Sequence, residues 1–424
     1  MNIKNFPSKI NGVVAAPPSK SITHRSIILA SLAYGTSVIK NALLSDDTKY
    51  TIAALKQLGV IIEHDDTKLV IHGSEGKLQA PKEPIFVGNS GSTLRMLSAV
   101  AALANGITTI TGEKRLCERP ITDLLTALKK MNIHADATNN LPPVQISGGK
   151  LKGGIITING SVSSQYITAL LLISPFAENT VWIVIDGDLR SKPYVALTLD
   201  LMKTFGVAVE NKNFKEFIIQ NHQPYIAQNY VVEGDYSSAS YFFAAAAVTK
   251  GKVTVKNLNQ NSSQGDRYFL DILERMGCYI ERNSNSVTVI GSKNLSGITV
   301  DMNDYPDIVQ TLAVVAAYAK GTSHITNIGH LKDKETDRIA STAQEFKKMN
   351  ISVKETAVSL AVVGGKPKGA IIETHNDHRI AMSFAVAGLA AEDETVIKNA
   401  QVVNKSYPNF WEDLRSIGAN IKTL

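Results

Sequence analysis

One short pattern recurs six times along the chain at a nearly constant spacing. Each copy is an amphipathic stretch that ends in Gly or Asn, the residues that commonly close a helix at its C-terminus. The six copies end at Gly59, Asn132, Gly206, Gly277, Asn350 and Gly418. The successive gaps are 73, 74, 71, 73 and 68 residues. This steady period predicts a fold that is built from repeated structural units.

Each amphipathic stretch is preceded by the same two patterns. Directly before it lies a strand-like alternation of apolar and polar residues, as in TSVIKN at residue 36 and KVTVKN at residue 252. Before that strand comes a stretch with almost no polar face, such as YFFAAAAV at residues 241–248. Because helices without a polar face are buried, each copy predicts a β-α-β-α-β-β unit with one buried helix and one surface helix.

The six units predict an α/β (α+β) protein of two domains with three units each. A chain of 424 residues is too long for one ordinary core. The last unit ends at ANIKTL without the strand that precedes a buried helix, whereas INGVVAAP near the N-terminus has that character. We therefore predict one domain from residues 1–15 plus 234–424 and another from residues 16–233, so that the chain crosses between them twice.

The composition excludes several classes of protein. Hydrophobic residues make up 44% of the chain and charged residues 19%, which is typical of globular proteins. The N-terminal stretch MNIKNFPSKING has no apolar signal segment, and the longest apolar runs are shorter than the ~20 residues of a membrane span. We therefore expect a soluble, cytoplasmic protein without a membrane partner.

Cysteine content and net charge narrow the possible ligands. Cys117 and Cys278 are too few for a disulfide framework or a metal cluster, so we expect no metal. The net charge of +6 would suit nucleic acid, but Lys and Arg are dispersed and form no run of five. A few concentrated cations that bind a small anionic substrate explain the charge equally well.

Every predicted buried helix begins with a cluster of polar residues. The clusters are Ser21 to Arg25, Ser92 to Arg95, Ser163 to Gln165, Ser237 to Ser240, Asp307 to Thr311 and Asn376 to Arg379. Helix capping explains any one of them. Related helices of one domain should, however, present their N-termini on one side, and each N-terminus carries roughly half a positive charge with unpaired amides. Together with Arg119 and Lys405 in later loops, these starts predict an anion-binding site.

The stretch DKETDR at residues 333–338 places five ionisable side chains just before a helical pattern. A solvated helix start is the simplest interpretation. If Lys334 and Arg338 were both helical, however, they would share a face and repel by roughly a few tenths of a kcal/mol. Two cations on one face favour an anion-binding role for this stretch.

Ten motifs in fixed order carry a resemblance to a known family. They are PPSKSITHR, VGNSGSTLR, ERPI, GSVSSQY, GDLRSKPY, EGDYSSASY, YPD, KETDR, NDHRIAM and NKSYP. Over residues 17–408 they closely resemble the 5-enolpyruvylshikimate-3-phosphate synthases. The resemblance implies two domains of three β-α-β-α-β-β repeats, each an inside-out α/β barrel, with the active site in the cleft between them.

The resemblance also implies an activity and its ligands. Members transfer the enolpyruvyl (1-carboxyvinyl) group of phosphoenolpyruvate to the 5-hydroxyl of 3-phosphoshikimate and release phosphate, in the shikimate pathway to chorismate and aromatic amino acids. The implied enzyme is a monomer without cofactor or metal, does not bind nucleic acid, and has glyphosate as a competitor of phosphoenolpyruvate.

Motif positions assign the residues to roles. The resemblance implies that 3-phosphoshikimate is bound by Lys20, Ser21, Arg25, Ser163, Ser164, Gln165, Ser191, Tyr194, Asp307, His330 and Lys334. It implies that phosphoenolpyruvate is bound by Lys20, Gly91, Arg119, Gln165, Arg338, Arg379 and Lys405. The implied catalytic residues are Glu335 as the acid, Asp307 as the acceptor of the hydroxyl proton, and Lys20. His330 departs from the pattern, because many members have Asn there.

Two alternatives remain open at this level. UDP-N-acetylglucosamine enolpyruvyl transferases share the fold and the donor, but carry a loop cysteine five residues before the equivalent of Arg119, where this chain has Lys114. A non-enzymatic basic scaffold that binds nucleic acid would explain the repeats and the net charge. It would not explain Asp307 and Glu335 among the cations, because carboxylates repel phosphate backbones.

Overall fold

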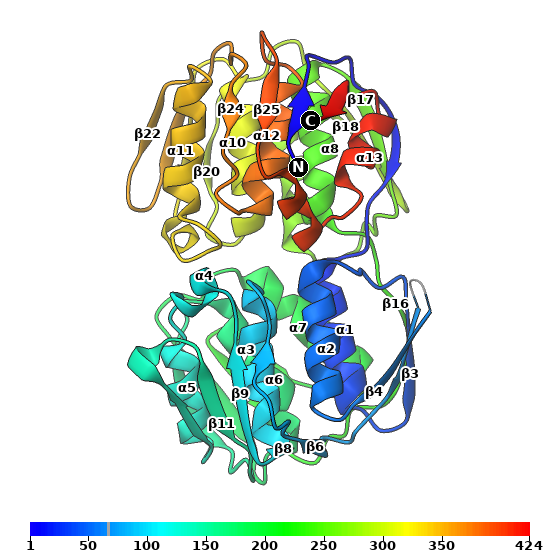
Figure 1. The fold of residues 1–424 in the computed structure, drawn as a ribbon, viewed down its shortest axis with the longest axis vertical. Coiled ribbons are helices and arrows are strands. Elements are labelled where there is room, and N and C mark those ends of the chain that lie inside the picture. Colours follow the sequence, from blue (N-terminus) through cyan, green and yellow to red (C-terminus); the bar gives the residue numbers. More distant parts are fainter. Residues whose placement is uncertain (66–67) are drawn as a thin grey trace. The chain divides into compact units, whose positions relative to one another are not determined.

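The computed structural model describes every residue except 66 and 67, and the chain divides into two compact units. Unit 1 comprises Met1–Pro17 and Glu233–Leu424, and unit 2 comprises Pro18–Val232 (Figure 1). Within the described residues, each unit has its own hydrophobic core and three four-stranded sheets. The predicted α/β class with three repeats per unit is therefore confirmed.

Unit 2 contains one buried and one surface helix in each repeat. Its buried helices are α1 (Lys20–Leu32), α3 (Gly91–Val100) and α6 (Ser164–Ile173). Its surface helices are α2 (Asp46–Gln57), α5 (Thr122–Lys130) and α7 (Lys192–Thr204), and α4 (Lys114–Cys117) is a single turn. Its strands are β3 (Thr36–Lys40), β4 (Ile61–Asp65), β5 (Lys68–His72), β6 (Leu78–Gln79), β7 (Ile85–Phe86), β8 (Ala104–Asn105), β9 (Ile107–Thr111), β10 (His134–Ala137), β11 (Val144–Ser147), β12 (Gly154–Asn159), β13 (Val181–Asp186), β14 (Glu210–Lys212), β15 (Glu216–Ile219) and β16 (Asn229–Val231).

Unit 1 repeats the same order of elements. Its buried helices are α8 (Tyr236–Thr249), α10 (Val309–Ala317) and α12 (His378–Gly388), and its surface helices are α9 (Phe269–Arg275), α11 (Arg338–Lys348) and α13 (Phe410–Ser416). Its strands are β1 (Ile3–Asn5), β2 (Asn11–Ala15), β17 (Lys252–Lys256), β18 (Tyr279–Asn283), β19 (Ser286–Ile290), β20 (Thr299–Asp301), β21 (Thr322–Thr326), β22 (Val353–Glu355), β23 (Leu360–Val363), β24 (Ile371–Ile372), β25 (Thr395–Ile397) and β26 (Ile421–Thr423). Short 3-10 turns include η4 (Gly265–Tyr268), η5 (Pro306–Ile308), η6 (Gly329–Leu331) and η7 (Ala400–Lys405).

All six sheets follow one pairing rule. The strand after each buried helix pairs in parallel with a strand that leads into a buried helix. In four sheets that strand leads into the same helix, as with β12 and β13 or β20 and β21. In the other two sheets it leads into the first buried helix of the other unit, as with β16 and β3 or β2 and β17. The later strand then pairs antiparallel with a strand such as β15 or β23. In those four sheets the crossover through a helix is what parallel neighbours require, and it fixes the starts of α3, α6, α10 and α12 at the same end of their sheets.

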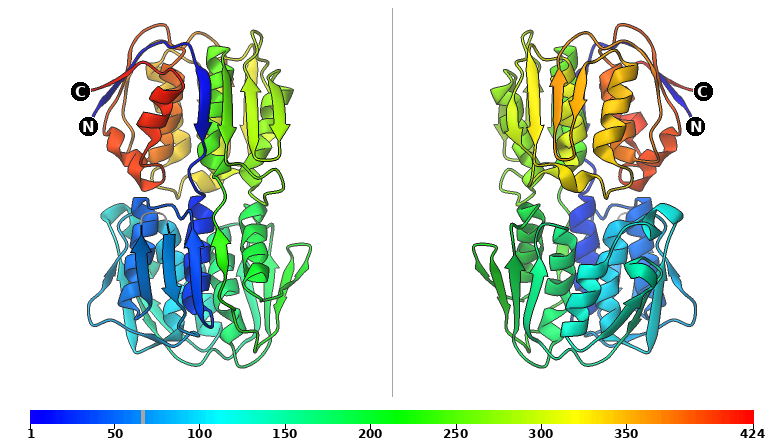
Figure 2. Two further views of the ribbon diagram at one scale, coloured as in Figure 1. Left: turned by 90° about the vertical axis from the view of Figure 1, so that its right-hand side faces the viewer. Right: turned by 90° about the vertical axis from the view of Figure 1, so that its left-hand side faces the viewer.

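Three sheets contain a strand from a distant part of the chain. Strand β2 pairs with β17, and β1 lies between β25 and β26 (Figure 2). In unit 2, β16 pairs with β3 and completes the sheet of the first repeat. The N-terminal strands therefore belong to unit 1, and the strand at residues 229–231 belongs to unit 2.

The predicted helix ends are confirmed by the backbone. All six terminal Gly and Asn residues have positive φ, from 59° at Asn350 to 106° at Gly277. Only Gly and, to a lesser degree, Asn adopt this left-handed conformation readily. The buried helices are tightly surrounded: a Cβ on Gly388 of α12 would lie 2.7 Å from Asn5 Nδ2. Among the described residues, no helix is both long and apolar enough to cross a membrane.

Candidate active site

A buried arginine organises the polar residues of unit 1. Arg338 is the first residue of α11 and its side chain is 2% exposed. Its Nε donates to Asp377 Oδ2 at 2.7 Å, and its two terminal nitrogens reach Asp307 Oδ1 at 3.3 Å and Glu335 Oε2 at 2.8 Å. A guanidinium has five donors in a rigid fork, which suits several carboxylates at once. Arg338 therefore joins three separate segments of unit 1.

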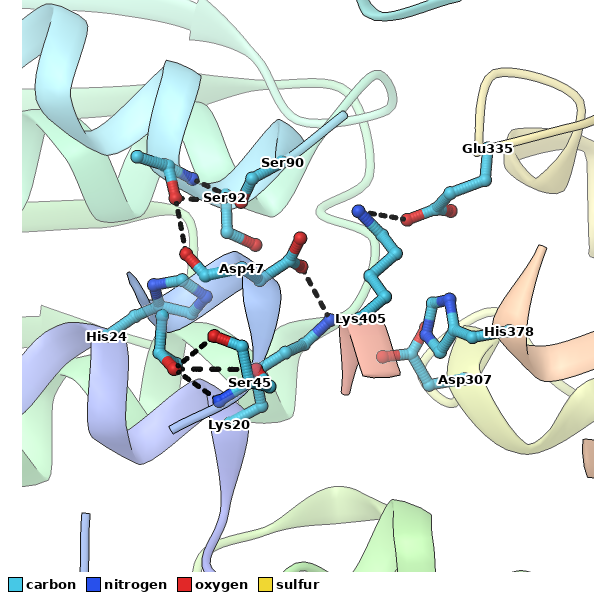
Figure 3. Close-up of polar contacts among 12 residues, drawn as sticks. Lys20, His24, Ser45, Asp47, Ser90, Ser92, Asp307, Glu335, His378 and Lys405 are labelled. Carbon is cyan, nitrogen blue, oxygen red and sulfur yellow. Dashed lines mark hydrogen bonds and ion pairs between the residues drawn. The ribbon is translucent and has the colours of Figure 1, made fainter. Parts of the chain in front are cut away.

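Two further cations complete this group. Arg379 lies in the first turn of α12, and its terminal nitrogens lie 2.7 Å from Asp307 Oδ2 and 3.3 Å from the hydroxyl of Tyr241. Lys405 ends η7 and its Nζ lies 3.7 Å from Glu335 Oε1 (Figure 3). We call these residues the Arg338 cluster, which consists of Asp307, Glu335, Arg338, Asp377, Arg379 and Lys405. Three carboxylates and three cations balance in formal charge.

The local charges explain the titration behaviour of the Arg338 cluster. Burial alone would lower the pKa of Arg338, but the carboxylates of Asp377, Glu335 and Asp307 outweigh that effect and raise it above its usual value. Arg338 therefore stays charged at every physiological pH. Burial also raises the pKa of the Tyr241 phenol to about 12, so Tyr241 is neutral beside Arg379.

The stretch DKETDR is not a solvated helix start. Asp337 caps α11 by accepting from the amides of Ile339 and Ala340, so the helix begins at Arg338 and Lys334 lies before it. The shared helical face that we considered for Lys334 and Arg338 is therefore absent. Glu335 and Arg338 meet instead through a bend in the chain.

Unit 2 holds a buried arginine in a different environment. Arg25 of α1 donates to the hydroxyl of Thr198 at 2.8 Å and to the carbonyls of Ser21 at 2.8 Å and Tyr194 at 3.2 Å. A longer contact of 3.4 Å reaches the Thr168 hydroxyl. All four acceptors are neutral, and burial lowers the pKa of Arg25 to about 10. A charge held only by neutral oxygens attracts an anion.

The three other serines that the resemblance assigns to the same ligand as Arg25 lie at helix starts. Ser163 caps α6 and accepts from the amide of Gln165, and Ser164 is the first residue of that helix. Ser191 precedes α7 in a left-handed conformation with φ of 55°. We call Ser21, Arg25, Ser163, Ser164, Ser191 and Tyr194 the Arg25 cluster. The positive ends of α6 and α7 favour an anion there.

Lys20 is paired with a buried carboxylate. Its Nζ lies 3.1 Å from Asp47 Oδ2 in α2 (Figure 3). The side chain of Lys20 is 13% exposed and that of Asp47 is 4% exposed. Ser45 and Thr48 cap α2 reciprocally, so Asp47 is not needed as the cap. The pair fixes the ammonium group at the start of α1.

A second cationic group surrounds Gly91, the first residue of α3. A Cβ added to Gly91 would lie 2.8 Å from Arg119 Nη1 and 3.0 Å from Arg95 Nη1. Arg95 also donates to Gln165 Oε1 at 2.6 Å, which leaves Gln165 Nε2 to donate to Ser92 at 3.1 Å. We call Gly91, Arg95, Arg119 and Gln165 the Gly91 cluster. The absence of a side chain at Gly91 lets two guanidinium groups approach its backbone closely.

Direct contacts join some of the predicted residues within each unit. In unit 1 they link Asp307, Glu335, Arg338, Arg379 and Lys405. In unit 2 they link Ser21, Arg25 and Tyr194. His330 is buried in η6 and Lys334 is partly buried in the following bend. Arg119 lies in a loop after the short helix α4, as expected, whereas Lys405 ends a 3-10 turn where we expected a plain loop. Backbone carbonyl and amide groups within these short turns form hydrogen bonds with one another. These bonds fix the positions of Arg119 and Lys405 without a long helix.

Sequence reasoning missed several residues of these groups. Asp47 and Asp377 bind Lys20 and Arg338, yet each reads in the sequence as a helix cap. Asp266 is buried beside Ser237 at the start of α8. Burial and the negative charge of Asp307 raise the pKa of Asp266 to about 7. No local signal distinguishes these acids from ordinary capping residues.

The arrangement suits the chemistry of a small, multiply charged anion. Guanidinium and ammonium groups bind carboxylate and phosphate, with arginine forks binding them bidentately. Asp307 and Glu335 lie against those cations and are partly accessible, with side chains 21% and 10% exposed. Carboxyl groups in such a position can accept or deliver a proton on a bound substrate.

Comparison with known proteins gives a consistent set of relatives. Residues 4–414 match the family model described as EPSP synthase (3-phosphoshikimate 1-carboxyvinyltransferase). A 3-phosphoshikimate 1-carboxyvinyltransferase of Methanococcoides burtonii is 44% identical over 420 residues, covering 98% of this chain and 97% of the relative. One from Methanococcus maripaludis strain C6 is 40% identical, covering 100% and 99%. The solved EPSP synthase of Acinetobacter baumannii has a TM-score of 0.84 at 28% identity and covers all of both chains.

Proposed function

Because this chain belongs to the EPSP synthase family, it is a 3-phosphoshikimate 1-carboxyvinyltransferase, and we propose that its three residue clusters bind and activate the two substrates. The reaction joins the 5-hydroxyl oxygen of 3-phosphoshikimate to C2 of phosphoenolpyruvate and releases inorganic phosphate. Both substrates are anions, which accounts for the net charge of +6 without nucleic acid. The family model also disfavours the UDP-N-acetylglucosamine enolpyruvyl transferase alternative.

The Arg25 cluster binds 3-phosphoshikimate. The uncompensated guanidinium of Arg25 and the positive starts of α6 and α7 suit the 3-phosphate, and the hydroxyl groups of the cluster add hydrogen bonds. Lys20, Gln165, Asp307, His330 and Lys334 complete the proposed contacts with the sugar acid. The neutral acceptors around Arg25 support this assignment, because they leave its charge available to a ligand.

Phosphoenolpyruvate is bound by cations of the other two clusters. The proposed contacts are Lys20, Gly91, Arg119, Gln165, Arg338, Arg379 and Lys405. Gly91 allows Arg119 to keep its position, since a Cβ would lie 2.8 Å from Arg119 Nη1. Gln165 Nε2 donates one hydrogen to Ser92, so its second hydrogen can be donated to the ligand. Donors suit a ligand whose carboxylate and phosphate oxygens are all acceptors.

The chemistry is assigned to three residues. Glu335 delivers a proton to C3 of phosphoenolpyruvate, which makes C2 electrophilic. The 5-hydroxyl oxygen then attacks C2 while Asp307 accepts its proton. Glu335, by then a carboxylate, takes a proton back from C3, and cleavage of the bond between C2 and the phosphate oxygen regenerates the vinyl group and releases phosphate. Lys20 and the arginines stabilise the negative charge on the departing phosphate.

One observation carries this assignment: Asp307 and Glu335 bind the same buried guanidinium, that of Arg338. Two carboxyl groups are thereby held near one cation that attracts phosphoenolpyruvate. The direct test measures phosphate release with phosphoenolpyruvate plus 3-phosphoshikimate, and separately with phosphoenolpyruvate plus UDP-N-acetylglucosamine. Release with the first pair alone is expected, and release with the second pair alone would refute the assignment.

The assembly state and the inhibitor are also part of the proposal. The protein acts as a monomer in the cytoplasm, and glyphosate competes with phosphoenolpyruvate for the cations of its site. These statements rest on the resemblance of the motifs. A sedimentation measurement and inhibition kinetics with varied phosphoenolpyruvate test them.

A further inference from the structure

The segment from Glu373 to Asp377 connects β24 to α12 (Figure 1). It brings Asp377 into contact with Arg338. Its central residues, His375 and Asn376, have φ values of 51° and 55°. This left-handed conformation costs about 1 kcal/mol or more for a residue with a side chain, and it persists only where the surroundings hold it. The segment therefore requires an anchor outside itself.

Glu345, in the middle of α11, provides that anchor. Its side chain is completely buried. Its carboxylate accepts from the Glu373 amide at 3.1 Å and lies 2.7 Å from His375 Nε2. Lys348 Nζ contacts both carboxylate oxygens, at 2.9 and 2.7 Å. Two of these three partners thus belong to the segment, and the third lies one helical turn away.

Glu345 and Arg338 hold the two ends of the same segment. They lie seven positions apart on α11, which is about two turns, so they share one face of the helix. Arg338 binds Asp377 at one end, and Glu345 binds Glu373 and His375 at the other. The left-handed residues lie between these two attachments.

The position of Asp377 affects both arginines of the cluster. Asp377 accepts from Arg338 Nε at 2.7 Å and from the backbone amide of Arg379 at 2.8 Å. A displaced segment would move this carboxylate. The Arg338 guanidinium would then lose a fixed partner, and the first turn of α12, which carries Arg379, would lose its cap. Small displacements of binding groups are costly because bound substrates must be held in a near-reactive geometry.

We propose that Glu345, through its contact with His375, is a positioning residue that keeps Asp377, and thereby Arg338 and Arg379, in the geometry that binds phosphoenolpyruvate. The inference rests on the proposed function, because it needs these two arginines to bind that substrate. Glu345 touches neither substrate and acts only through residues 373–377. The competing view is that Glu345 merely stabilises unit 1.

A pair of substitutions separates the two views. His375→Asn removes the contact with Glu345, since the shorter side chain does not reach, while Asn still tolerates positive φ. Lys348→Met removes another partner of the same carboxylate, keeps an apolar stem and leaves the segment untouched. If Glu345 positions the segment, His375→Asn raises the KM for phosphoenolpyruvate about fivefold and leaves the KM for 3-phosphoshikimate within about twofold. Lys348→Met changes neither constant.

Glu345→Gln supplies a second line of evidence. It should raise the KM for phosphoenolpyruvate, and adding His375→Asn should then have little further effect, because both changes break the same contact. Thermal unfolding of each variant, recorded in parallel, reports any loss of stability. Equal KM changes in His375→Asn and Lys348→Met, or additive effects in the double variant, would overturn the inference.

Arg338→Lys distinguishes failure of the inference from failure of the proposed site. If Arg338→Lys has a normal KM for phosphoenolpyruvate, Arg338 does not bind that substrate and both proposals fall. If Arg338→Lys raises the KM for phosphoenolpyruvate while His375→Asn leaves it normal, the proposed binding site is supported and only the positioning role of Glu345 is refuted.

Discussion

Arg338 Nε and Asp377 Oδ2 lie 2.7 Å apart, although 39 positions of sequence separate the two residues. The side chain of Arg338 is 2% exposed and that of Asp377 is fully buried. A buried ion pair adds little net stability when complete, but removing one partner leaves a desolvated charge and is strongly destabilising. The pair is therefore a sensitive point of unit 1.

Asp377→Asn should destabilise the protein by about 3 kcal/mol and raise the KM for phosphoenolpyruvate. The amide keeps the shape of the side chain but removes the charge that balances Arg338. Urea unfolding measures the effect as a lower midpoint at an unchanged slope. Asp393→Asn, at an exposed acid between α12 and β25, serves as control and should change stability by less than about 0.5 kcal/mol.

The Glu335→Gln variant should still bind both substrates, but its kcat should fall sharply. Glutamine preserves an oxygen for Arg338 and Lys405 but has no proton to deliver to C3. A general acid contributes about 100-fold or more to rate, so kcat should fall by at least that factor. Calorimetric titration with each substrate checks that binding is preserved. A variant with nearly normal kcat would remove Glu335 from the role of acid.

Much of the fold could be predicted because the repeats are local in sequence. Each helix end required only a Gly or Asn in the left-handed conformation, and each buried helix required only a run without a polar face. These signals do not depend on distant contacts. The polar residues in the first turns of the buried helices, such as Arg25 and Arg379, could be predicted from the sequence for the same reason.

The partners of the charged residues could not be predicted in this way. Asp47 meets Lys20 only because α1 and α2 pack together, and in sequence it resembles a first-turn acid of α2. Glu345 lies on a surface helix, where a charged side chain is expected to face solvent, yet its side chain is completely buried. Such pairings depend on packing between elements, which a periodic pattern does not encode.

Arg25→Lys should weaken the binding of 3-phosphoshikimate specifically. Lysine keeps the charge but cannot reproduce the fork that contacts Thr198 and the carbonyls of Ser21 and Tyr194. We expect the KM for 3-phosphoshikimate to rise about tenfold or more while the KM for phosphoenolpyruvate changes little. Arg282→Lys, at a surface arginine paired with Glu274, is the matched control. Equal increases in both KM values would argue against a 3-phosphate site at Arg25.

Gly91→Ala should weaken the binding of phosphoenolpyruvate and leave the binding of 3-phosphoshikimate nearly unchanged. The added methyl group would lie 2.8 Å from Arg119 Nη1, so the guanidinium must shift and the space beside it is reduced. The KM for phosphoenolpyruvate should rise about tenfold, since a displaced binding group costs on the order of 1.4 kcal/mol. Gly149→Ala is the control, because its nearest neighbour would be 3.9 Å away. An unchanged KM in Gly91→Ala would place phosphoenolpyruvate elsewhere.

Asp266 should make stability depend on pH. Its pKa is raised from 3.8 to about 7, chiefly by burial and then by Asp307, so the native state holds a proton that the unfolded state releases. Stability from this group is complete below pH 4 and is lost as pH rises through 7. The Asn side chain in Asp266→Asn stays neutral, so the free energy of unfolding of this variant should depend less on pH in this range. Chemical unfolding of both proteins between pH 5 and 8 tests this. The difference in unfolding free energy between variant and wild type should increase from pH 5 to about 7 and then level off, because Asp266 is ionised in both states above its native pKa. A constant difference would show that Asp266 is ionised throughout.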